Sequence, residues 1–358
     1  MSEFLFVTWD GGGNVPPLLG LARELHERGH VVRVVGHAAQ ADRFAPLRFS
    51  SHHPRREFTA TGPVNVPALL SVFADRSYGA EVLRLLDTRP ADVVVVDCLL
   101  FGVMDALRQA ERPYVVLEHT LDSYLRVAAR GPMGLALRAM RLPALRLLDA
   151  ATERLAATLP ELDAGHGPCT HIGPVVTGTS ATPTEPRVLL SLSTVAFRGL
   201  PARWQRALDA VGELNVPVIA TLGPAIDPSR LRVPANVEVH RWLAHDQVLP
   251  QVSLVVGHGG HATTMAALAH DVPVLVLPVD AKSDQRLIDR RIRDADAGLS
   301  LPPRASTRQI RAAVTELLEN SSYRSAAARL GARIRALDGR TRGADQLELL
   351  ASTGGVGL

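Results

Sequence analysis

Hydrophobic and polar positions along the chain follow two periods, one typical of buried strands and one typical of amphipathic helices. Near the N-terminus, an apolar run over residues 4–8 is followed by an amphipathic stretch over 17–28. Residues 91–100, ADVVVVDCLL, form a continuous run rich in β-branched residues, which is typical of a strand buried on both faces of a parallel sheet. In this half we expect strands at 4–8, 31–36, 91–100 and 114–119 and helices at 17–28 and 103–110.

The alternation restarts after GPVVTGTSATPTEP, a segment with the composition of an interdomain linker. Beyond it we expect strands at 187–193, 216–222, 237–243, 253–260 and 272–278, and helices at 201–213, 262–270, 284–294, 307–318 and 322–337. Two consecutive halves of repeated βα units predict an α/β protein with two doubly wound parallel-sheet domains. We predict an N-terminal domain over 1–170, a linker over 171–186, a C-terminal domain over 187–340 and a tail over 341–358 with disordered last residues.

Two stretches of the first half have a weaker pattern. Residues 45–78 contain four prolines, and we expect an irregular loop region there. Residues 133–158 form an Arg-rich amphipathic pattern broken near Pro143, which predicts one helix or a pair of helices. Such a helix can dock on a membrane surface, but a solvated charged face is the commoner role, and we favour that interpretation.

The composition is that of an ordinary globular protein: 358 residues, 46% hydrophobic and 21% charged. The chain contains neither an apolar stretch long enough to span a membrane nor a secretory signal. Cys98 and Cys169 lack metal-ligand spacing, which favours two buried thiols in a cytoplasmic protein without a bound metal. A net charge of only +3 with 4% aromatic residues argues against a nucleic acid partner, and both a monomer and a homodimer remain open.

The loop WDGGGNVPP, residues 9–17, follows the first strand, and its three glycines indicate that a ligand or another backbone comes close. A dinucleotide-binding fingerprint would need G-x-G-x-x-G and an acidic residue after the second strand. Here Gly11 and Gly13 are followed by Pro16, and the second strand ends without an acidic residue. This spacing disfavours a nicotinamide-dependent oxidoreductase.

The second half contains the stronger chemical signal, VVGHGGHATTMAAL. A buried strand ends at Gly257, two glycines turn the chain, and Thr263 and Thr264 open a helix. Free amides at a helix N-terminus, the helix dipole and threonine hydroxyls together favour a phosphate or diphosphate. His258 can donate to the same oxygens, so this turn can hold a leaving nucleoside diphosphate without a metal ion. The alternative is a plain glycine turn that packs the helix on the strand.

This turn, with RWLAHDQVLP before it and PVLVLPVDAKSDQ after it, resembles the nucleotide-sugar box of the family 1, UDP-glycosyltransferase-like enzymes. FLFVTWDGGGNVPPLLGLARELHERGHVVRVVG looks like the family's opening strand, glycine loop and helix, and VVVVDCLLFG and YVVLEHT match its later strands. The resemblance, closest to the bacterial natural-product type, covers most of the chain and is loosest over 40–80 and 130–185. It implies the GT-B fold, with an acceptor-binding N-terminal domain and a nucleotide-sugar-binding C-terminal domain, both Rossmann-like and facing a central cleft.

The resemblance also implies roles for particular residues. Trp242 and the backbone of Leu243 would flank the nucleobase. Asp284 and Gln285 match the family's Asp-Gln pair, which hydrogen-bonds sugar hydroxyls. The diphosphate would be held by His258, Gly259, Gly260, Thr263, Thr264, Ser193 and Thr194.

The chain departs from the family's box in two places. The Pro-Gln that follows the tryptophan is replaced by Ala244 and His245. The Asp-Gln pair lies two residues further from Pro278 than is usual, so Asp280 or Lys282 could intrude on sugar recognition. These departures affect the choice of sugar more than the choice of nucleotide.

The residue after the glycine loop is commonly a histidine in the family, sometimes an aspartate, and it deprotonates the acceptor hydroxyl. Here Asn14 takes that position, and an amide can orient an acceptor but cannot take its proton. In order of preference, the alternative bases are Asp97, which matches the acid that partners the family's histidine, then Asp10 in the loop, then His119 at the end of the next strand. Each also has a structural interpretation: Asp10 can cap the loop, and His119 can be a satisfied core histidine.

Together these features predict an inverting, metal-independent glycosyltransferase, a hexosyltransferase with no cofactor beyond its nucleotide-sugar substrate. It would move a sugar from UDP or dTDP to a small acceptor near Gly12 and Gly13, forming an O-glycoside or a C-glycoside. Asn14 favours an aromatic or polyketide-like natural-product acceptor, because a phenol is already a fair nucleophile. The alternatives are a catalytically silent nucleotide-binding auxiliary protein of the same fold and a nucleotide-sugar epimerase.

Overall fold

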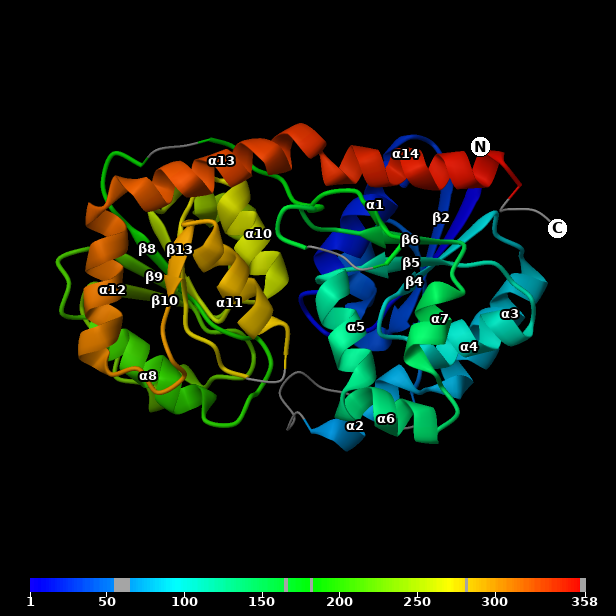
Figure 1. Ribbon diagram of the computed structural model, residues 1–358, viewed down its shortest axis with the longest axis horizontal. Coiled ribbons are helices and arrows are strands. Elements are labelled where there is room, and N and C mark those ends of the chain that lie inside the picture. Colours follow the sequence, from blue (N-terminus) through cyan, green and yellow to red (C-terminus); the bar gives the residue numbers. More distant parts are fainter. Residues whose placement is uncertain (55–64, 164–166, 181–182, 281–282, 355–358) are drawn as a thin grey trace. The chain divides into compact units, whose positions relative to one another are not determined.

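The computed structural model describes residues 1–54, 65–163, 167–180, 183–280 and 283–354, which form two compact units (Figure 1). Unit 1 contains the described residues up to Val175 and those from Leu337 onward, and unit 2 contains those from Val176 to Ala336. Each unit has its own sheet, in which neighbouring strands pair in parallel. The predicted fold class, two Rossmann-like domains of parallel sheet and helices, is confirmed.

The sheet of unit 1 has seven strands in the order β3-β2-β1-β4-β5-β6-β7. They are β1 (Glu3–Val7), β2 (Val31–His37), β3 (Arg48–His52), β4 (Val93–Asp97), β5 (Val115–Glu118), β6 (Glu153–Ala156) and β7 (Thr170–His171). The helices of unit 1 are α1 (Val15–Glu27), α2 (Val66–Phe73), α3 (Arg76–Thr88), α4 (Phe101–Gln109), α5 (Asp122–Arg130), α6 (Pro132–Ala139), α7 (Ala144–Asp149) and α14 (Gly339–Ser352), with a 3₁₀ helix over Ala38–Phe44. The strand order reverses between β1 and β4, and in doubly wound folds ligands bind at the carboxyl ends of the strands at such a reversal.

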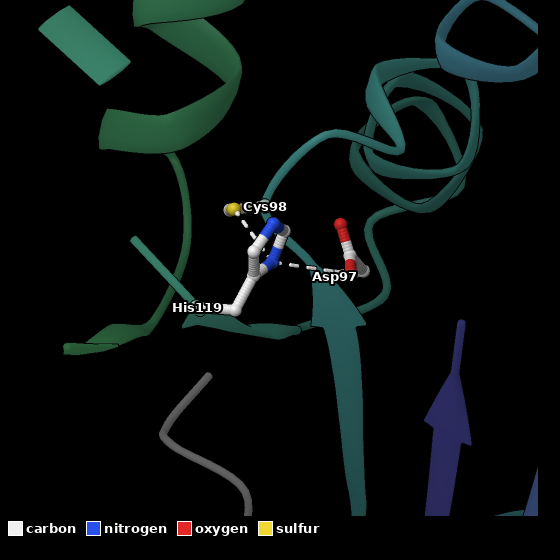
Figure 2. Close-up of side chains that lie close together, drawn as sticks. All are labelled: Asp97, Cys98 and His119. Carbon is white, nitrogen blue, oxygen red and sulfur yellow. Dashed lines mark hydrogen bonds and ion pairs between the residues drawn. The ribbon is translucent and has the colours of Figure 1, made fainter. Parts of the chain in front are cut away.

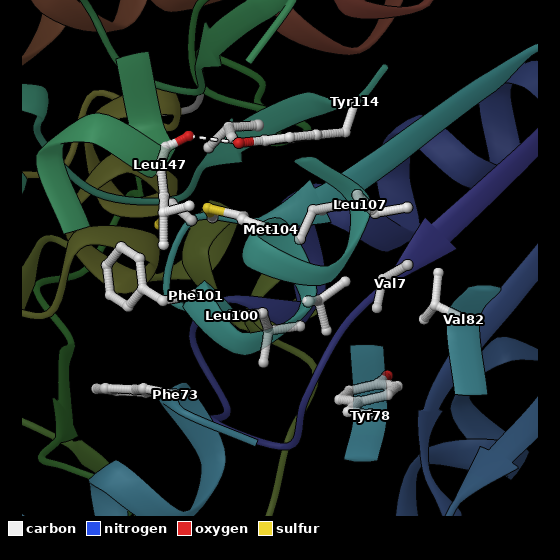
Figure 3. Packing of buried hydrophobic residues seen from close by; sticks show 14 of the residues in the cluster. Val7, Phe73, Tyr78, Val82, Leu100, Phe101, Met104, Leu107, Tyr114 and Leu147 are labelled. Carbon is white, nitrogen blue, oxygen red and sulfur yellow. Dashed lines mark hydrogen bonds between the residues drawn. The ribbon is translucent and has the colours of Figure 1, made fainter. Parts of the chain in front are cut away.

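Both faces of this sheet are buried, and successive residues of β1 point to opposite faces. Phe4 and Phe6 pack in a core with α1 and α14. Leu5 and Val7 pack in a second core with α3, α4 and α7, and Figure 3 shows Val7 among the side chains of this core. Helices on both faces explain why the central strands β1, β4 and β5 are apolar at nearly every position.

The sheet of unit 2 has six strands in the order β10-β9-β8-β11-β12-β13. They are β8 (Val188–Ser191), β9 (Val218–Thr221), β10 (Val237–His240), β11 (Leu254–Gly257), β12 (Val274–Val276) and β13 (Gly298–Ser300). The helices are α8 (Leu200–Val211), α9 (His245–Val248), α10 (His261–Ala269), α11 (Gln285–Asp294), α12 (Thr307–Glu319) and α13 (Ser321–Leu337), with 3₁₀ helices over Pro228–Arg230 and Leu249–Gln251. One face of the sheet packs against α8 and α12, and the other packs against α9 and α10.

The structure contains elements that the hydrophobic pattern did not predict. β3 and α2 lie within 45–78, which we expected to be irregular, and α2 begins where the Asn65 side chain accepts a hydrogen bond from the Ala68 amide at 2.9 Å. β6 lies within 133–158, a stretch that we expected to be helical throughout. The sequence pattern did not reveal this strand, because four residues are too few to interrupt a helical pattern visibly. α14 occupies the expected tail, and its Leu347 packs under α1 in the core of unit 1.

Two expectations from composition can be compared with the structure. No helix among the described residues has both the length and the apolar character that crossing a membrane requires. Cys98 and Cys169 are both free thiols, and Cys98 is buried as expected. The expected burial of Cys169 is wrong, since this side chain is only partly covered beside β7, a two-residue strand at the edge of the sheet.

Candidate functional site

In unit 1 the loops after β1, β4 and β5 lie side by side, because these strands are neighbours in the sheet. Asp97 is the last residue of β4 and pairs with Leu117 of β5, two residues before His119. The three loops therefore contain all four residues that the sequence predicts for catalysis. The structure brings Asn14, Asp97 and His119 into contact and places Asp10 apart from them.

The Asp97 carboxylate is surrounded by N–H groups. Its Oδ1 accepts hydrogen bonds from Trp9 Nε1 at 3.2 Å and from the Leu99 amide at 3.0 Å. Its Oδ2 accepts a hydrogen bond from Asn14 Nδ2 at 2.9 Å and lies 3.3 Å from His119 Nδ1. The residue is only 2% exposed, so both oxygens are engaged within the protein.

His119 lies between Asp97 and Cys98, with its Nδ1 3.4 Å from the Cys98 sulfur (Figure 2). Burial alone would lower the pKa of His119, but the neighbouring Cys98 and Asp97 outweigh burial and raise this pKa well above its usual value. Burial raises the pKa of the Cys98 thiol. The arrangement favours an imidazole that is held by a carboxylate on one side and by a buried thiol on another.

Asp97, Cys98 and His119 are also the residues of this region that could hold a metal ion. Their oxygen, sulfur and nitrogen atoms lie within 4.8 Å of one another, and zinc accepts such ligands. However, both Asp97 oxygens already accept hydrogen bonds, and the raised pKa of Cys98 opposes the thiolate form that a metal needs. Hydrogen bonding accounts for this cluster better than metal ligation does.

Asn14 holds the glycine loop closed against Asp97. Its Oδ1 accepts a hydrogen bond from the Gly11 amide at 3.1 Å, and its Nδ2 donates to the Trp9 carbonyl oxygen at 2.9 Å as well as to Asp97. Gly12 has a φ of 86°, a backbone conformation that a side chain would strain. The Asn14 side chain is buried within this loop, and the residue is 3% exposed.

The other residues of the loop lie further from this cluster. Asp10 forms an ion pair with Arg43 at 3.3 Å, and 28% of its side chain is exposed. The Gly13 amide donates to the Gly11 carbonyl oxygen at 3.3 Å. Asp10 thus contributes to the outer surface of the loop.

In unit 2 the sequence predicts an anion site at the turn between β11 and α10. α10 begins at His261, so Thr263 and Thr264 lie within its first turn instead of starting it. Gly260 precedes the helix, and no side chain caps its N-terminus. The first-turn amides are thus not engaged by a capping side chain, and the positive end of the helix dipole points at the turn.

The two glycines of this turn cannot be replaced without a collision. Gly259 has a φ of 82°, and a Cβ there would lie 2.7 Å from Val276 Cγ1. A Cβ on Gly260 would lie 2.6 Å from His258 Nε2. Burial lowers the pKa of His258 to about 4, so its ring is neutral at neutral pH. Its buried Nδ1 has no hydrogen-bond partner within the described part of the chain.

Two neighbouring loops approach this turn within unit 2. β8 pairs with β11, so Ser193 and Thr194 follow a strand that is adjacent to the turn. Ser193 is buried, and its hydroxyl accepts a hydrogen bond from the Val195 amide at 3.0 Å. Thr194 is exposed. On the other side, a Cβ on Gly259 would lie 3.4 Å from the Gln285 carbonyl oxygen.

The predicted Asp-Gln pair is placed at the start of α11. Asp284 precedes the helix, and Gln285 is buried within its first turn. The Gln285 side-chain oxygen accepts from the Val279 amide at 2.8 Å and from the Asp280 amide at 3.1 Å. This oxygen therefore holds the preceding loop in place. Lys282 lies outside the described residues.

Trp242 and Leu243 follow β10 at the edge of the sheet, separated from β8 by β9. Trp242 is 74% exposed, which leaves its indole face open to a ligand, whereas Leu243 is partly buried. His245, which replaces the family's glutamine, lies with its Nε2 3.3 Å from the Ser191 hydroxyl. Burial lowers the pKa of His245, so a neutral imidazole takes part in this contact at the carboxyl end of β8.

Sequence reasoning did not identify Trp9 or Cys98 as part of the unit 1 cluster. The signal for Trp9 is its position directly before the glycine loop, since a buried indole N–H needs an acceptor nearby. Cys98 follows Asp97 in the chain, but its contact with His119 depends on the pairing of β4 with β5.

Residues 205–341 match the family described as "Erythromycin biosynthesis protein CIII-like, C-terminal domain". The chain is 27% identical to 4'-demethylrebeccamycin synthase of Lentzea aerocolonigenes, in an alignment that covers 97% of this chain and 99% of that protein. It is 30% identical to the TDP-daunosamine transferase DnrS of Streptomyces peucetius, over 67% of this chain and 64% of that protein.

Among solved structures, the glycosyltransferase VinC in complex with dTDP is similar with a TM-score of 0.74. The match covers 98% of this chain and 99% of that chain, at 20% sequence identity. This similarity shows a common fold along nearly the whole length.

Proposed function

Because the chain belongs to the natural-product glycosyltransferases of the GT-B fold, we propose that it moves a sugar from a UDP- or dTDP-linked donor to a small acceptor. The acceptor is aromatic or polyketide-like, and the product is an O-glycoside or a C-glycoside. The observation on which this proposal depends is the turn between β11 and α10, where uncapped helix amides, two threonines and the neutral His258 lie together.

This turn suits a diphosphate. Backbone amides at a helix N-terminus bind phosphate oxygens, and the helix dipole adds a favourable positive potential. Thr263 and Thr264 contribute hydroxyls within the first turn, and the neutral ring of His258 contributes one further N–H. A thymidine diphosphate is supported by the names of two similar proteins, the TDP-daunosamine transferase and VinC in complex with dTDP.

The reaction follows from these donors. The acceptor oxygen, or an activated aromatic carbon, forms a bond to the anomeric carbon from the face opposite the diphosphate. The bond between the anomeric carbon and the diphosphate oxygen breaks, and its electron pair leaves with the diphosphate, so the configuration inverts. Donors that already point at the leaving oxygens stabilise the developing charge, which is the role that a metal ion has in other transferases.

Asn14 favours an acceptor that loses its proton easily. The asparagine amide has no basic lone pair, and here both ends of its side chain bind Gly11, Trp9 and Asp97. A phenol needs less help from a base than an aliphatic alcohol does. This supports an aromatic acceptor.

We also propose that the enzyme acts in the cytoplasm. Cys98 and Cys169 are free thiols, and thiols persist in reducing compartments. Its partners are then its two small-molecule substrates, and the chain works as a monomer or a homodimer.

The test begins with a thermal-shift screen against UDP, dTDP and GDP, followed by the corresponding sugar nucleotide and a library of phenols read by mass spectrometry. We expect a stabilising shift with UDP or dTDP and a product heavier than its phenol by one sugar. His258→Ala should abolish most of this product, and the matched control is His240→Ala at the end of β10.

Two results would contradict the proposal. No shift with any of the three nucleotides would remove the diphosphate site. A shift with UDP or dTDP, without transfer to a phenol and without hydrolysis of the sugar nucleotide, would instead support a catalytically silent binding protein.

A further inference from the structure

The proposed transfer needs a group that takes the proton of an acceptor hydroxyl. On the basis of the proposed function, the geometry points to His119 as the catalytic base, with Asp97 and Asn14 as positioning residues that hold and orient its ring. This moves the base from the start of α1, where the family resemblance places it, to the carboxyl end of β5.

Asp97, our first candidate from the sequence, is poorly arranged to take a proton. Its two oxygens face the N–H groups of Trp9, Leu99, Asn14 and His119, at 2.9 to 3.3 Å. Each donor stabilises the ionised carboxylate, and an added proton would have to displace one of them. The residue is also 2% exposed, which denies a substrate direct access to it.

The same contacts define which nitrogen of His119 is basic. An ionised carboxylate only accepts hydrogen bonds, so the nitrogen that faces Asp97, Nδ1, must be the one with the proton. The neutral ring then has its lone pair on Nε2. Within the described part of the chain no group is hydrogen-bonded to Nε2, and Figure 2 shows both drawn interactions on the other ring nitrogen.

His119 is also the accessible member of the cluster. Its side chain is 13% exposed, whereas Asp97 and Cys98 are almost fully covered. A histidine whose Nδ1 faces a carboxylate and whose Nε2 is available to a substrate has the arrangement of a general base. Asp10, the remaining candidate, is instead paired with Arg43.

Asn14 supports this arrangement from the glycine loop. Its Nδ2 donates to the same Asp97 oxygen that faces His119, and its Oδ1 is fixed by the Gly11 amide. Asn14 thus fixes the carboxylate in the rotamer that holds the His119 ring. The glycine loop therefore helps to position His119, although Asn14 stands in it where the family has a basic residue.

The step is balanced as follows. The acceptor O–H bond breaks and its proton bonds to the Nε2 lone pair, which leaves His119 as an imidazolium paired with the Asp97 carboxylate. The acceptor oxygen bonds to the anomeric carbon, and the electron pair of the broken sugar–phosphate bond leaves on the diphosphate. Proton release from Nε2 to solvent restores the enzyme.

Among the described residues, the titratable groups that contact the ring are Asp97 and Cys98, both at the end of β4. The negative charge of Asp97 favours the imidazolium, and the pKa of His119 is raised as a result of its neighbours. The fraction of His119 that is free to accept a proton therefore rises with pH. We expect kcat to rise with pH up to the raised pKa of His119.

The test compares two acceptors in His119→Ala and His119→Gln. A nitrophenol ionises by itself near neutral pH, whereas an unsubstituted phenol keeps its proton. With the unsubstituted phenol, kcat should fall by about 10²–10⁴-fold, the usual contribution of a general base. With the ionised nitrophenol, kcat should stay within about tenfold of the wild type, because no proton remains to be removed.

The controls separate this inference from the proposed function. His26→Ala, an exposed histidine on α1, should change neither rate, and the affinity for UDP or dTDP should be unchanged in all variants. If the wild type transfers sugar to neither acceptor, the proposed function itself fails. If it does transfer, equal losses with both acceptors in His119→Ala, or no loss with the unsubstituted phenol, would overturn the role of His119 alone.

The positioning role of Asp97 has its own readout. Asp97→Asn keeps an oxygen for Trp9 and Leu99 but removes the charge that faces His119. The acidic limb of the pH profile of kcat should then move to lower pH. A lower rate with an unmoved acidic limb would show a merely structural role and would overturn the assignment of Asp97.

Discussion

The carboxyl edges of the two sheets use different chemistry. In unit 1 the edge is built from side chains that converge on one buried carboxylate, Asp97, and on the histidine beside it. In unit 2 the edge is built from a glycine turn, an uncapped helix N-terminus, hydroxyls and a neutral imidazole, His258. We propose that the first arrangement controls the position of a proton and that the second binds an anion.

The two arrangements should respond differently to substitution. The polar groups around Asp97 hydrogen-bond one another, so they stabilise unit 1 even without a ligand. No side chain caps α10, and the Nδ1 of His258 has no hydrogen-bond partner within the described part of the chain. Substitution of Asp97 should therefore reduce stability in addition to activity, whereas substitution of His258 should reduce activity with little effect on stability.

The largest effect is expected for Asp97→Ala, which removes the buried carboxylate that accepts hydrogen bonds from Trp9, Asn14 and Leu99. The free energy of unfolding should fall by about 3–5 kcal/mol, as for a broken buried pair. Urea denaturation measures it. The matched control, Asp10→Ala, removes an exposed ion pair and should cost less than about 1 kcal/mol. Equal losses for the two variants would contradict the comparison.

His258→Ala should reduce activity with little effect on stability. Removal of one donor to the leaving phosphate should lower kcat by about 10²–10³-fold. The free energy of unfolding should change by less than about 1 kcal/mol, because the buried Nδ1 loses no hydrogen bond. Steady-state kinetics and urea denaturation of the same preparation measure both. A kcat within about tenfold of the wild type would count against the diphosphate site.

Trp242→Ala should affect nucleotide binding alone. The indole is 74% exposed, so its removal should leave the free energy of unfolding unchanged. Loss of stacking on a nucleobase costs about 1–3 kcal/mol, which corresponds to a loss of affinity for UDP or dTDP of about 5–150-fold. Calorimetric titration measures this affinity, with Val233→Ala as the control at another exposed apolar residue of unit 2. An unchanged affinity would show that the nucleobase binds elsewhere.

Stability should also depend on pH, through buried histidines in both units. Burial lowers the pKa of His37 in unit 1 and of His258 in unit 2 from 6.5 to about 4. The unfolded chain binds these protons below pH 6.5 and the folded chain does not, so this part of the stability is complete above pH 6.5 and is lost as pH falls to about 4.

Scanning calorimetry between pH 4 and pH 6.5 measures this dependence. Tm should fall more steeply with acid in the wild type than in His37→Gln or in His258→Gln, because each variant removes one titrating group. Parallel Tm curves for the three proteins would show that these imidazoles do not titrate as the structure predicts.

Local patterns predicted much of the fold and part of the site. The β-branched run at 91–100 contains β4, and the glycine turn after Gly257 is where the sequence places it. The contacts of Asp97 with Asn14 and with His119 depend on the strand order β1-β4-β5, which periodicity does not reveal. α14 was missed for a similar reason, since its apolar residues are recognisable as core only once α1 lies against them.

The most direct test of the central claim, that the turn between β11 and α10 binds the diphosphate, is an NMR titration of the ¹⁵N-labelled protein with dTDP and UDP. The account predicts that the backbone amides of Gly259 to Thr263 show the largest shifts at saturation, and that thymidine without phosphates leaves them in place. Shifts confined to other residues, with these amides unmoved, would contradict it.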